Sequence, residues 1–185
     1  AAKNQYRRPH NYRNYADVDT DFSPQINVLI GENAQGKTNL LEAVYVLALA
    51  RSHRTNNDRE LIRFGEDEAR LTGKLFSRER DFTVEAALFR DRRRKLWVNH
   101  VPAKSAAALS QVCNTVFFCP EDLFLIREGA SVRRKFMDSA LCQLRPRYAA
   151  ALADYAKTYD HKTRILRDWE EKPDLLAALP EFNER

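Results

Sequence analysis

Residues 26–42 read INVLIGENAQGKTNLLE, which is a short apolar run, a loop with two glycines and the start of a second apolar segment. Residues 31–38 have the spacing G-x-x-x-x-G-K-T, the full Walker A pattern. We expect a short buried strand over 26–30 and a buried helix over 38–50, because this pattern lies between a strand and a helix. The stretch therefore predicts a phosphate-binding loop.

Each residue type in the loop has a chemical reason. Glycines let the backbone curl so that consecutive N–H groups point at phosphate oxygens, and the helix N-terminus adds a partial positive charge. Lys37 is expected to bridge the β- and γ-phosphates, and the Thr38 hydroxyl to ligate Mg²⁺. The expected ligands are thus ATP and Mg²⁺. The residues predicted to bind them are Gly31, Glu32, Asn33, Ala34, Gln35, Gly36, Lys37 and Thr38.

The sequence lacks the second half of a hydrolytic site. Hydrolysis needs a carboxylate at the end of another apolar strand to hold the magnesium ion. In TVFFCPED, residues 115–122, two residues separate the apolar run from Glu121 and Asp122, which are better explained as the start of the next helix. The sequence also has no glycine-rich LSGGQ-type signature. We therefore expect no catalytic residue within this chain.

Beyond the loop, the hydrophobic period changes from helical to two. Alternation over 69–75 and 82–88, followed by 96–98, predicts an antiparallel meander with one packed face. Longer helices are predicted over 130–144 and over 146–169, where Pro146 suits a first helical turn. The other expectations are helices over 58–64 and 105–112, a strand over 115–118, and no central strand over the polar residues 1–12, which contain Pro9.

These elements predict an α/β fold with two lobes. A nucleotide-binding lobe is expected over residues 1–120 and a mainly helical lobe, incomplete, over 121–185. The final stretch DLLAALPEFNER breaks at Pro180 without a closing element, so we expect the chain to be part of a longer one. The predicted fold class is a P-loop NTPase with a mixed sheet that includes the antiparallel meander, plus a partial α-helical second lobe.

Composition favours an anionic partner and argues against membranes. Of 185 residues, 44% are hydrophobic and 31% charged, the formal net charge is +5 and the pI is about 9.2. No apolar run approaches the roughly 18 residues that span a bilayer, and no secretory signal is visible, so we expect a soluble, cytoplasmic protein without membrane contact. Three cysteines without CxxC spacing and four scattered histidines make a disulfide framework or a zinc site an unfavoured interpretation.

The densest basic run is RDRRRK, residues 90–95, in the expected connection between two strands of the meander. Phosphate contact with DNA is the functional interpretation, with Arg92, Arg93, Arg94 and Lys95 as the candidate residues. The alternative is a solvated turn that keeps sheet edges from pairing with neighbouring molecules. The sequence alone leaves both open.

Several segments together resemble one family, the bacterial RecF recombination mediators. They are, in family order, NYRNY (11–15), GENAQGKTNLLEAVYVLALARSHRT (31–55), ELIRFG (60–65), FFCPEDLFLI (117–126), SVRRKFMD (131–138) and LRPRYAAALADY (144–155). The resemblance implies a P-loop ATPase of the ABC/SMC head type that acts in DNA replication, DNA damage repair and the SOS response. It implies an ATP-dependent homodimer that closes on DNA at gaps and single-strand/double-strand junctions, works with RecR and RecO-type mediators to load recombinase, and opens on slow ATP hydrolysis.

The resemblance also implies which arginines approach the nucleotide. Arg13 in NYRNY, and Arg51 or Arg54 in ARSHRT, are implied to approach it, with surface salt pairing as the alternative. Two departures stand out. KNQYRRPH replaces the alternating apolar first strand of the family, and the family's Walker B carboxylates and signature segment lie C-terminal to the end of this chain. We therefore expect weak ATPase activity only from the full-length dimer, and nucleotide binding without turnover from this chain.

Three other interpretations remain open at this level. One is another ABC/SMC-type ATPase head, against which the absence of coiled-coil heptads counts. A second is a small-molecule P-loop kinase, which would need a substrate lid with convergent arginines. The third is a non-enzymatic nucleic-acid-binding module that keeps the loop as a scaffold. Tighter DNA binding with ATP than with ADP would separate the RecF-like clamp from all three.

Overall fold

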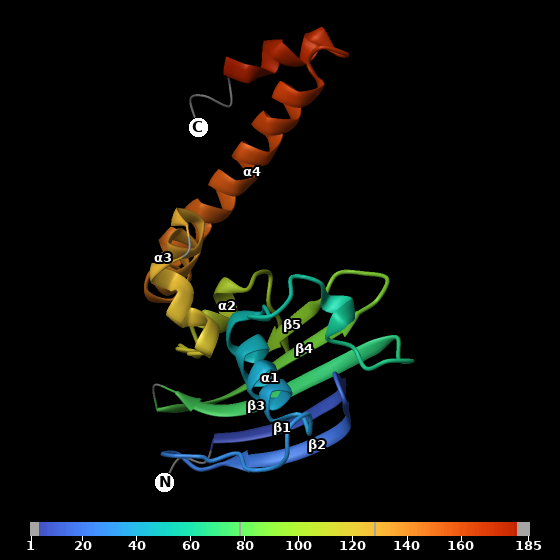
Figure 1. The fold of residues 1–185 in the computed structure, drawn as a ribbon, viewed down its shortest axis with the longest axis vertical. Helices are drawn as coiled ribbons and strands as arrows, with labels where there is room; N and C mark the ends of the chain where they lie inside the picture. Colours follow the sequence, from blue (N-terminus) through green and yellow to red (C-terminus); the bar gives the residue numbers. More distant parts are fainter. Residues whose placement is uncertain (1–3, 78, 128, 181–185) are drawn as a thin grey trace. The chain divides into compact units, whose positions relative to one another are not determined.

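The computed structural model describes residues 4–77, 79–127 and 129–180, and the chain divides into two units, Ala1–Phe124 and Leu125–Arg185. The first unit contains a sheet and the helix that follows the predicted phosphate loop, and the second is helical (Figure 1). The assignment of nucleotide binding to a lobe over 1–120, and the role of the lobe over 121–185, stay predictions.

One antiparallel sheet forms the scaffold of the first unit (Figure 1). Its strands lie in the order β2-β1-β3-β4-β5-β6, and every pairing within the described residues is antiparallel. The predicted meander is therefore confirmed. The strands are β1 (Asn4–Tyr12), β2 (Tyr15–Phe22), β3 (Glu68–Ser77), β4 (Arg80–Phe89), β5 (Lys95–Val98) and β6 (Val101–Pro102).

The core lies between this sheet and helix α1 (Lys37–Leu49), which runs across one face of the sheet (Figure 1). Alternate residues of β3 and β4 point into it: Leu71 pairs with Ala86, and both are buried. Val46 of α1 and Tyr12 at the end of β1 are also completely buried in this cluster. The helix after the loop is thus fixed on the sheet by apolar packing, as its composition predicts.

Strand β1 corrects the expectation for residues 1–12, because Asn4–Tyr12 form a strand with neighbours on both sides. It pairs with β2 on one edge and with β3 on the other. Both ladders shift register between Arg7 and His10, which is where Pro9 lies. A bulge leaves a residue outside the ladder, so a proline without an N–H is tolerated in the sheet. The sequence does not reveal this bulge, and for that reason Pro9 argued against a strand in the sequence analysis.

The strand predicted over residues 26–30 is wrong in this structure. The segment has no regular secondary structure, and Ile26, Val28 and Ile30 are 83%, 72% and 90% exposed. A continuous apolar run is typical of a strand that lies between other strands. None of the strands in the described ranges pairs with it, so its backbone has no ladder to join.

The shorter elements are less regular than predicted. Residues 58–64 contain the 3₁₀ turn η1 (Asp58–Glu60) and an isolated bridge from Ile62 to Tyr12, and 105–112 contain α2 (Ala107–Ser110). The expected strand over 115–118 is wrong. Instead of pairing, Phe117 places its ring 4.1 Å from that of His53, so an aromatic contact anchors this segment. The predicted helix start at Glu121 and Asp122 is confirmed as η2 (Pro120–Ile126).

The second unit consists of α3 (Ala130–Leu144), α4 (Pro146–Asp168) and η3 (Pro173–Ala178). The two long helices confirm the predicted ranges, and Pro146 occupies the first turn of α4. The Tyr148 hydroxyl of α4 donates to Asp138 of α3 and joins the two helices. Among the described residues, no helix has both the length and the apolar character needed to cross a membrane.

Leu71 gives a direct test of the core. Replacing it with alanine is expected to lower the free energy of unfolding of the first unit by about 2–5 kcal/mol, because a fully buried leucine leaves a cavity. Trp97 on β5 reports on this unit in urea titrations once Trp169 is changed to phenylalanine. Val101→Ala, at a 64% exposed position, is the control and is expected to leave the midpoint unchanged. Equal midpoints for both variants would contradict this core.

Candidate functional site

The predicted phosphate loop leads directly into the N-terminus of α1. The first helical hydrogen bond runs from the Leu40 N–H to the Gly36 carbonyl at 3.0 Å. The N–H groups of residues 37–39 precede it, so the helix offers them no carbonyl partner. Together with the helix dipole, such groups form a natural anion site. The fold therefore supplies the backbone donors that the motif predicts.

Gly36 is required by close packing as well as by backbone conformation. Its φ is +103°, and a Cβ at this position would lie 2.7 Å from the Tyr15 hydroxyl and 2.8 Å from side-chain atoms of Asn14. Both residues belong to the turn region between β1 and β2. The hairpin therefore rests against the loop just before α1 begins, and a larger residue at Gly36 would push it away.

Lys37 and Thr38 are the two loop side chains predicted to contact the nucleotide and its metal ion. The Lys37 ammonium donates to the carbonyls of Gly31 and Glu32 at 2.7 and 2.6 Å, so its side chain folds back over the loop. Thr38 is exposed in the first turn of the helix. The structure thus brings together the amine and the hydroxyl predicted to hold phosphate and Mg²⁺, and the other predicted loop residues before Gly36 are exposed beside them.

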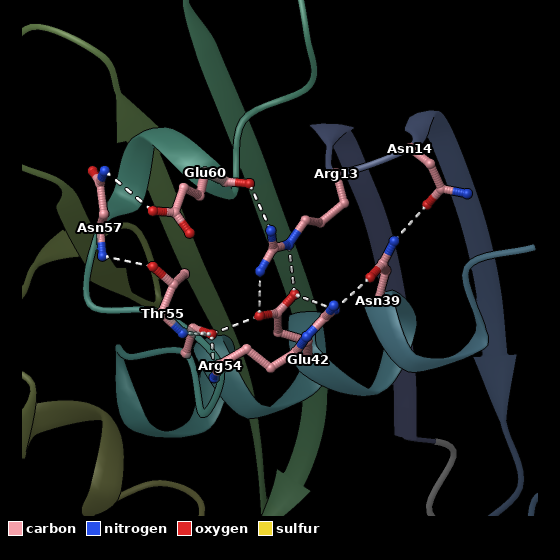
Figure 2. A network of polar contacts seen from close by, with 9 residues as sticks. Arg13, Asn14, Asn39, Glu42, Arg54, Thr55, Asn57 and Glu60 are labelled. Carbon is pink, nitrogen blue, oxygen red and sulfur yellow. Dashed lines mark hydrogen bonds and ion pairs between the residues drawn. The ribbon is translucent and has the colours of Figure 1, made fainter. Parts of the chain in front are cut away.

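A buried carboxylate lies one turn further along α1 (Figure 2). Glu42 is fully buried and accepts two hydrogen bonds of 2.8 Å from the Nε and one terminal nitrogen of Arg13. The Ser52 hydroxyl donates to it at 2.5 Å, and a guanidinium nitrogen of Arg54 lies 3.8 Å away. Such a carboxylate is stable inside the protein only because these groups surround it.

The partners of Glu42 come from two segments on either side of α1 in the sequence. Arg13 lies in the turn after β1, while Ser52 and Arg54 follow α1. Ala50 ends the helix in a left-handed conformation, with φ 53° and its N–H on the Val46 carbonyl. The chain reverses there. This reversal is what brings Ser52 and Arg54 back beside the N-terminal half of the helix.

A chain of amides continues from Arg54 to the phosphate loop, as Figure 2 shows in part. Arg54 donates to the Asn39 side-chain carbonyl at 2.9 Å, and the Asn39 amide donates to that of Asn14 at 2.9 Å. The Asn14 amide reaches the backbone carbonyl of Gln35 in the loop at 3.4 Å. Position 39 is in the first turn of α1, so these bonds connect Arg54 with the helix end that would face a phosphate.

The hydrogen bonds and charges of this cluster favour the ionised forms of Glu42 and Arg13. Burial alone would raise the pKa of Glu42, but hydrogen bonds from Arg13 and Ser52 and the positive charges of both arginines lower it below its ordinary value. The hydrogen bond to Glu42 raises the pKa of Arg13. Burial, with the Glu42 charge, raises the pKa of the Tyr12 hydroxyl far above its usual range. Glu42 is therefore an anion and Tyr12 neutral at physiological pH.

The structure separates the three arginines predicted near the nucleotide. Arg13 is bound to Glu42 and to the Glu60 carbonyl at 2.9 Å, with 18% of its side chain exposed, so it has a structural role here. Arg54 is 46% exposed and touches the first turn of α1 through Asn39. It is the predicted arginine that this geometry places best for an incoming anion. Arg51 is half-buried just past the C-terminus of α1, and its role stays a prediction.

The basic run 90–95 is also divided by its contacts. Arg94 is paired with Asp58 and donates to the Ala50 carbonyl, so it holds the turn, and its contact with DNA stays a prediction. Arg92 lies over the Phe89 ring at 3.9 Å from its centroid. Arg93 and Lys95 are exposed. The exposed side chains of Arg93 and Lys95 therefore fit the DNA interpretation better than Arg94, whose donors are used within the protein.

Four residues of the site were not predicted from the sequence: Asn14, Asn39, Glu42 and Ser52. One signal was present, because Glu42 is the only charged residue in the run NLLEAVYVLALA. A carboxylate on a buried helix needs a partner. The others carried no comparable signal, since polar residues at such positions are usually exposed. Their importance depends on segments that meet only in the folded chain.

Comparison with known proteins agrees with this geometry. The sequence model of the AAA ATPase domain family matches residues 10–104, which include the phosphate loop, α1 and the whole Glu42 cluster. The chain belongs to the AAA ATPase domain family. Its curated relatives are named DNA replication and repair protein RecF, so the resemblance to the RecF family is confirmed.

Two such relatives show the extent of the match. The protein from Agathobacter rectalis is 40% identical over 169 residues, which are 91% of this chain and 47% of the relative. The protein from Bacillus cereus is 43% identical over 157 residues, which are 85% of this chain and 42% of the relative. The chain spans about half the length of the curated relatives it matches.

Solved structures confirm the fold class. The recombination mediator protein RecF-ATPrS of the RecFOR pathway superposes with a TM-score of 0.85 at 30% identity, over 98% of this chain and 50% of that one. An SMC ATPase head, from work on ATP-driven dimerization and DNA-stimulated activation, superposes with a TM-score of 0.57 at 16% identity, over 75% of this chain and 97% of that one. The fold is thus that of a P-loop ATPase of the ABC/SMC type.

Glu42→Gln tests the buried cluster. At pH 7 we expect the free energy of unfolding of the first unit to fall by about 3–5 kcal/mol, because Arg13 keeps a largely buried charge without its counter-ion. The pKa of Glu42 is lowered in the folded protein. Its contribution is therefore complete above its unfolded pKa of about 4.3 and is lost as the pH falls through the lower folded value. The difference between wild type and variant should narrow in urea titrations on acidification.

Glu60→Gln is the matched control for this experiment. It changes an exposed side chain and leaves the backbone carbonyl that accepts from Arg13 in place. We expect its unfolding midpoint to follow the wild type at every pH. If Glu42→Gln also followed the wild type at neutral pH, the carboxylate would not carry the stability assigned to it.

Proposed function

We propose that this chain is the nucleotide-binding part of an ATP-gated DNA replication and repair protein that acts in the cytoplasm. One observation carries the proposal: the Lys37 amine lies over a loop whose glycine is locked against the β1–β2 hairpin, at the N-terminus of a buried helix. This is the arrangement that binds a triphosphate. The RecF relatives and a RecF-ATP structure support the choice of ATP.

The residues of the site fit a bound ATP with Mg²⁺. The Lys37 amine would move from the carbonyls of Gly31 and Glu32 to the β- and γ-phosphates, while the backbone N–H groups at the helix start hold the oxygens. The Thr38 hydroxyl would ligate Mg²⁺, which neutralises phosphate charge when bound. Arg54, held on Asn39, is the arginine proposed to meet phosphate charge from the side. Catalytic groups for hydrolysis are proposed to lie outside this chain.

For the complete protein we propose an ATP-dependent dimer that closes on DNA. The gap or single-strand/double-strand junction is the proposed target, and loading of recombinase with RecR and RecO-type mediators the proposed outcome. The relatives' name and the RecFOR pathway of the related structure support this assignment. The γ-phosphate can order loops that are released when it leaves, so slow hydrolysis would reset the clamp.

The exposed apolar segment 26–30 fits the same proposal. Ile26, Val28 and Ile30 lie just before the phosphate loop and are largely exposed. A contiguous apolar stretch with unpaired backbone is a surface that another strand or helix normally covers. We propose that parts of the complete protein outside this chain pair with it and thereby fix the loop from its N-terminal side.

Nucleotide affinity tests the first part of the proposal. Lys37→Ala should weaken binding of a fluorescent ATP analogue by about 10-fold or more, because a charge-assisted contact contributes about 1.5–3 kcal/mol. Lys74→Ala removes an exposed lysine of β3 and should leave the affinity unchanged. The chain should release no phosphate at steady state. Turnover that disappears in Lys37→Ala would show that it contains a complete catalytic site after all.

DNA affinity in different nucleotide states tests the clamp. The full-length protein should bind gapped duplex DNA more tightly with ATP than with ADP or without nucleotide, and Lys37→Ala should remove the difference. Fluorescence anisotropy of a labelled duplex at fixed ionic strength measures it. Equal affinity in all three states would favour a nucleic-acid module that keeps the loop only as a scaffold. Phosphate transfer to a small-molecule acceptor would favour the kinase.

A further inference from the structure

A groove of about 720 Å³ lies where β5 and β6 meet the turn that follows β4. Arg93 and Lys95 line it from the turn and the start of β5, and Lys104 lines it from the segment after β6. Its apolar lining includes Trp97 and Pro102. We call this feature the basic groove. Its volume falls within the range of about 300–1,000 Å³ that is usual for ligand sites.

The charge of the basic groove is positive and largely uncompensated. Among the described residues that line it, the only carboxylate is that of Asp58, and Arg94 occupies both of its oxygens. The remaining charged groups in the lining are Arg93, Lys95 and Lys104, all exposed. Cations that converge on one hollow without a carboxylate raise the local concentration of anions.

The turn that carries Arg93 and leads into Lys95 is held in place. Arg94 donates to the Ala50 carbonyl as well as to Asp58. Arg90 donates to the Glu66 carbonyl at 2.5 Å and to the Arg63 carbonyl at 3.2 Å. These arginines use their donors on the protein itself. The backbone on either side of Arg93 is thereby fixed, so the groove is formed before any ligand arrives, which lowers the ordering cost of binding.

An aromatic side chain stands at the border of the groove. Trp97 is partly exposed and also lines a smaller hollow of about 210 Å³, together with Arg70, Glu85 and His100. In that second hollow Arg70 is paired with Glu68, and the Glu85 carboxylate lies 2.9 Å from the His100 ring, so a phosphate there would meet a carboxylate. An anion is therefore expected on the side of Arg93, Lys95 and Lys104, with a flat apolar group against Trp97. Phosphates joined to flat bases are the chemistry of a nucleic-acid strand.

We propose that the basic groove binds single-stranded DNA, with backbone phosphates on Arg93, Lys95 and Lys104 and a base against Trp97. The assignment rests on the proposed function, because it takes DNA as the ligand, and it adds where an unpaired strand next to a junction would be held. It also divides the basic run 90–95: Arg93 and Lys95 contact the ligand, whereas Arg90 and Arg94 build the turn. Lys104, outside that run, belongs to the same site.

Trp97 fluorescence provides the direct test. The chain has two tryptophans, so Trp169→Phe leaves Trp97 as the only one. Titration with oligo-dT of about ten nucleotides, within the usual site size of about 4–16, should quench its emission. In anisotropy with labelled oligo-dT, Trp97→Ala should weaken binding about 10-fold, while Trp97→Phe, which keeps a ring, should weaken it only about 2-fold.

A charge variant and a matched control isolate the three cations. Arg93→Gln/Lys95→Gln/Lys104→Gln should weaken oligo-dT binding at least about 10-fold and flatten the slope of log K against log salt by about 2, since each of three phosphate contacts on a single strand contributes about 0.7. Lys74→Gln/Arg80→Gln/Lys172→Gln removes the same charge from exposed positions that do not line the groove and lie outside the basic run. It should change the slope much less. Circular dichroism confirms that both variants are folded.

The outcomes separate this proposal from the proposed function. Equal weakening by both triple variants would overturn it, because net charge alone would then explain binding. Quenching by poly-glutamate with the same dependence on Arg93, Lys95 and Lys104 would also overturn it and indicate an acidic peptide. If the protein did not bind oligo-dT but still bound gapped duplex in an ATP-dependent way, only the proposal for the basic groove would be overturned. No DNA binding in any nucleotide state would sink the proposed function as well.

Discussion

The ion pair between Arg13 and Glu42 is the constraint on which the candidate site depends. It joins the β1–β2 turn to α1 only one turn past Lys37, and the carboxylate is completely buried. A buried charge is costly unless its partners are held close, so the hairpin and the helix cannot separate easily. Below them, Val46 and Leu71 fix the same helix on the sheet. Polar and apolar contacts together set the direction of the helix N-terminus.

Much of the architecture follows from local pattern. Alternation over β3 and β4, helical periodicity in α1, and Pro146 at the start of α4 each depend on neighbours within a few residues. Such signals survive folding because each element buries the face that its own sequence makes apolar. The phosphate loop belongs with them, since its glycines, lysine and helix start are contiguous in the chain. Its predicted residues therefore come together without help from distant segments.

The features that were predicted wrongly or not predicted at all depend on interactions between residues far apart in the sequence. The bulge that admits Pro9 occurs in both ladders of β1, and the sequence near Pro9 does not encode the partners of these ladders. Residues 26–30 have the composition of an inner strand, but composition cannot create the neighbour that its backbone needs. For Glu42 the situation is reversed: its composition does not suit a buried position, but partners far away in the sequence are present. Arg13 and Ser52 make this buried charge stable.

The two basic regions of the first unit follow the same physical rule. At the phosphate loop, Arg13 satisfies a buried carboxylate, while Arg54 is more exposed and Lys37 folds back over the loop. At the basic groove, Arg94 satisfies Asp58, while Arg93 and Lys95 stay exposed. A guanidinium can hold a carboxylate through two parallel donors and so fix a backbone turn. Neighbouring cations are then presented at fixed positions, and an anion that meets them has little ordering left to do.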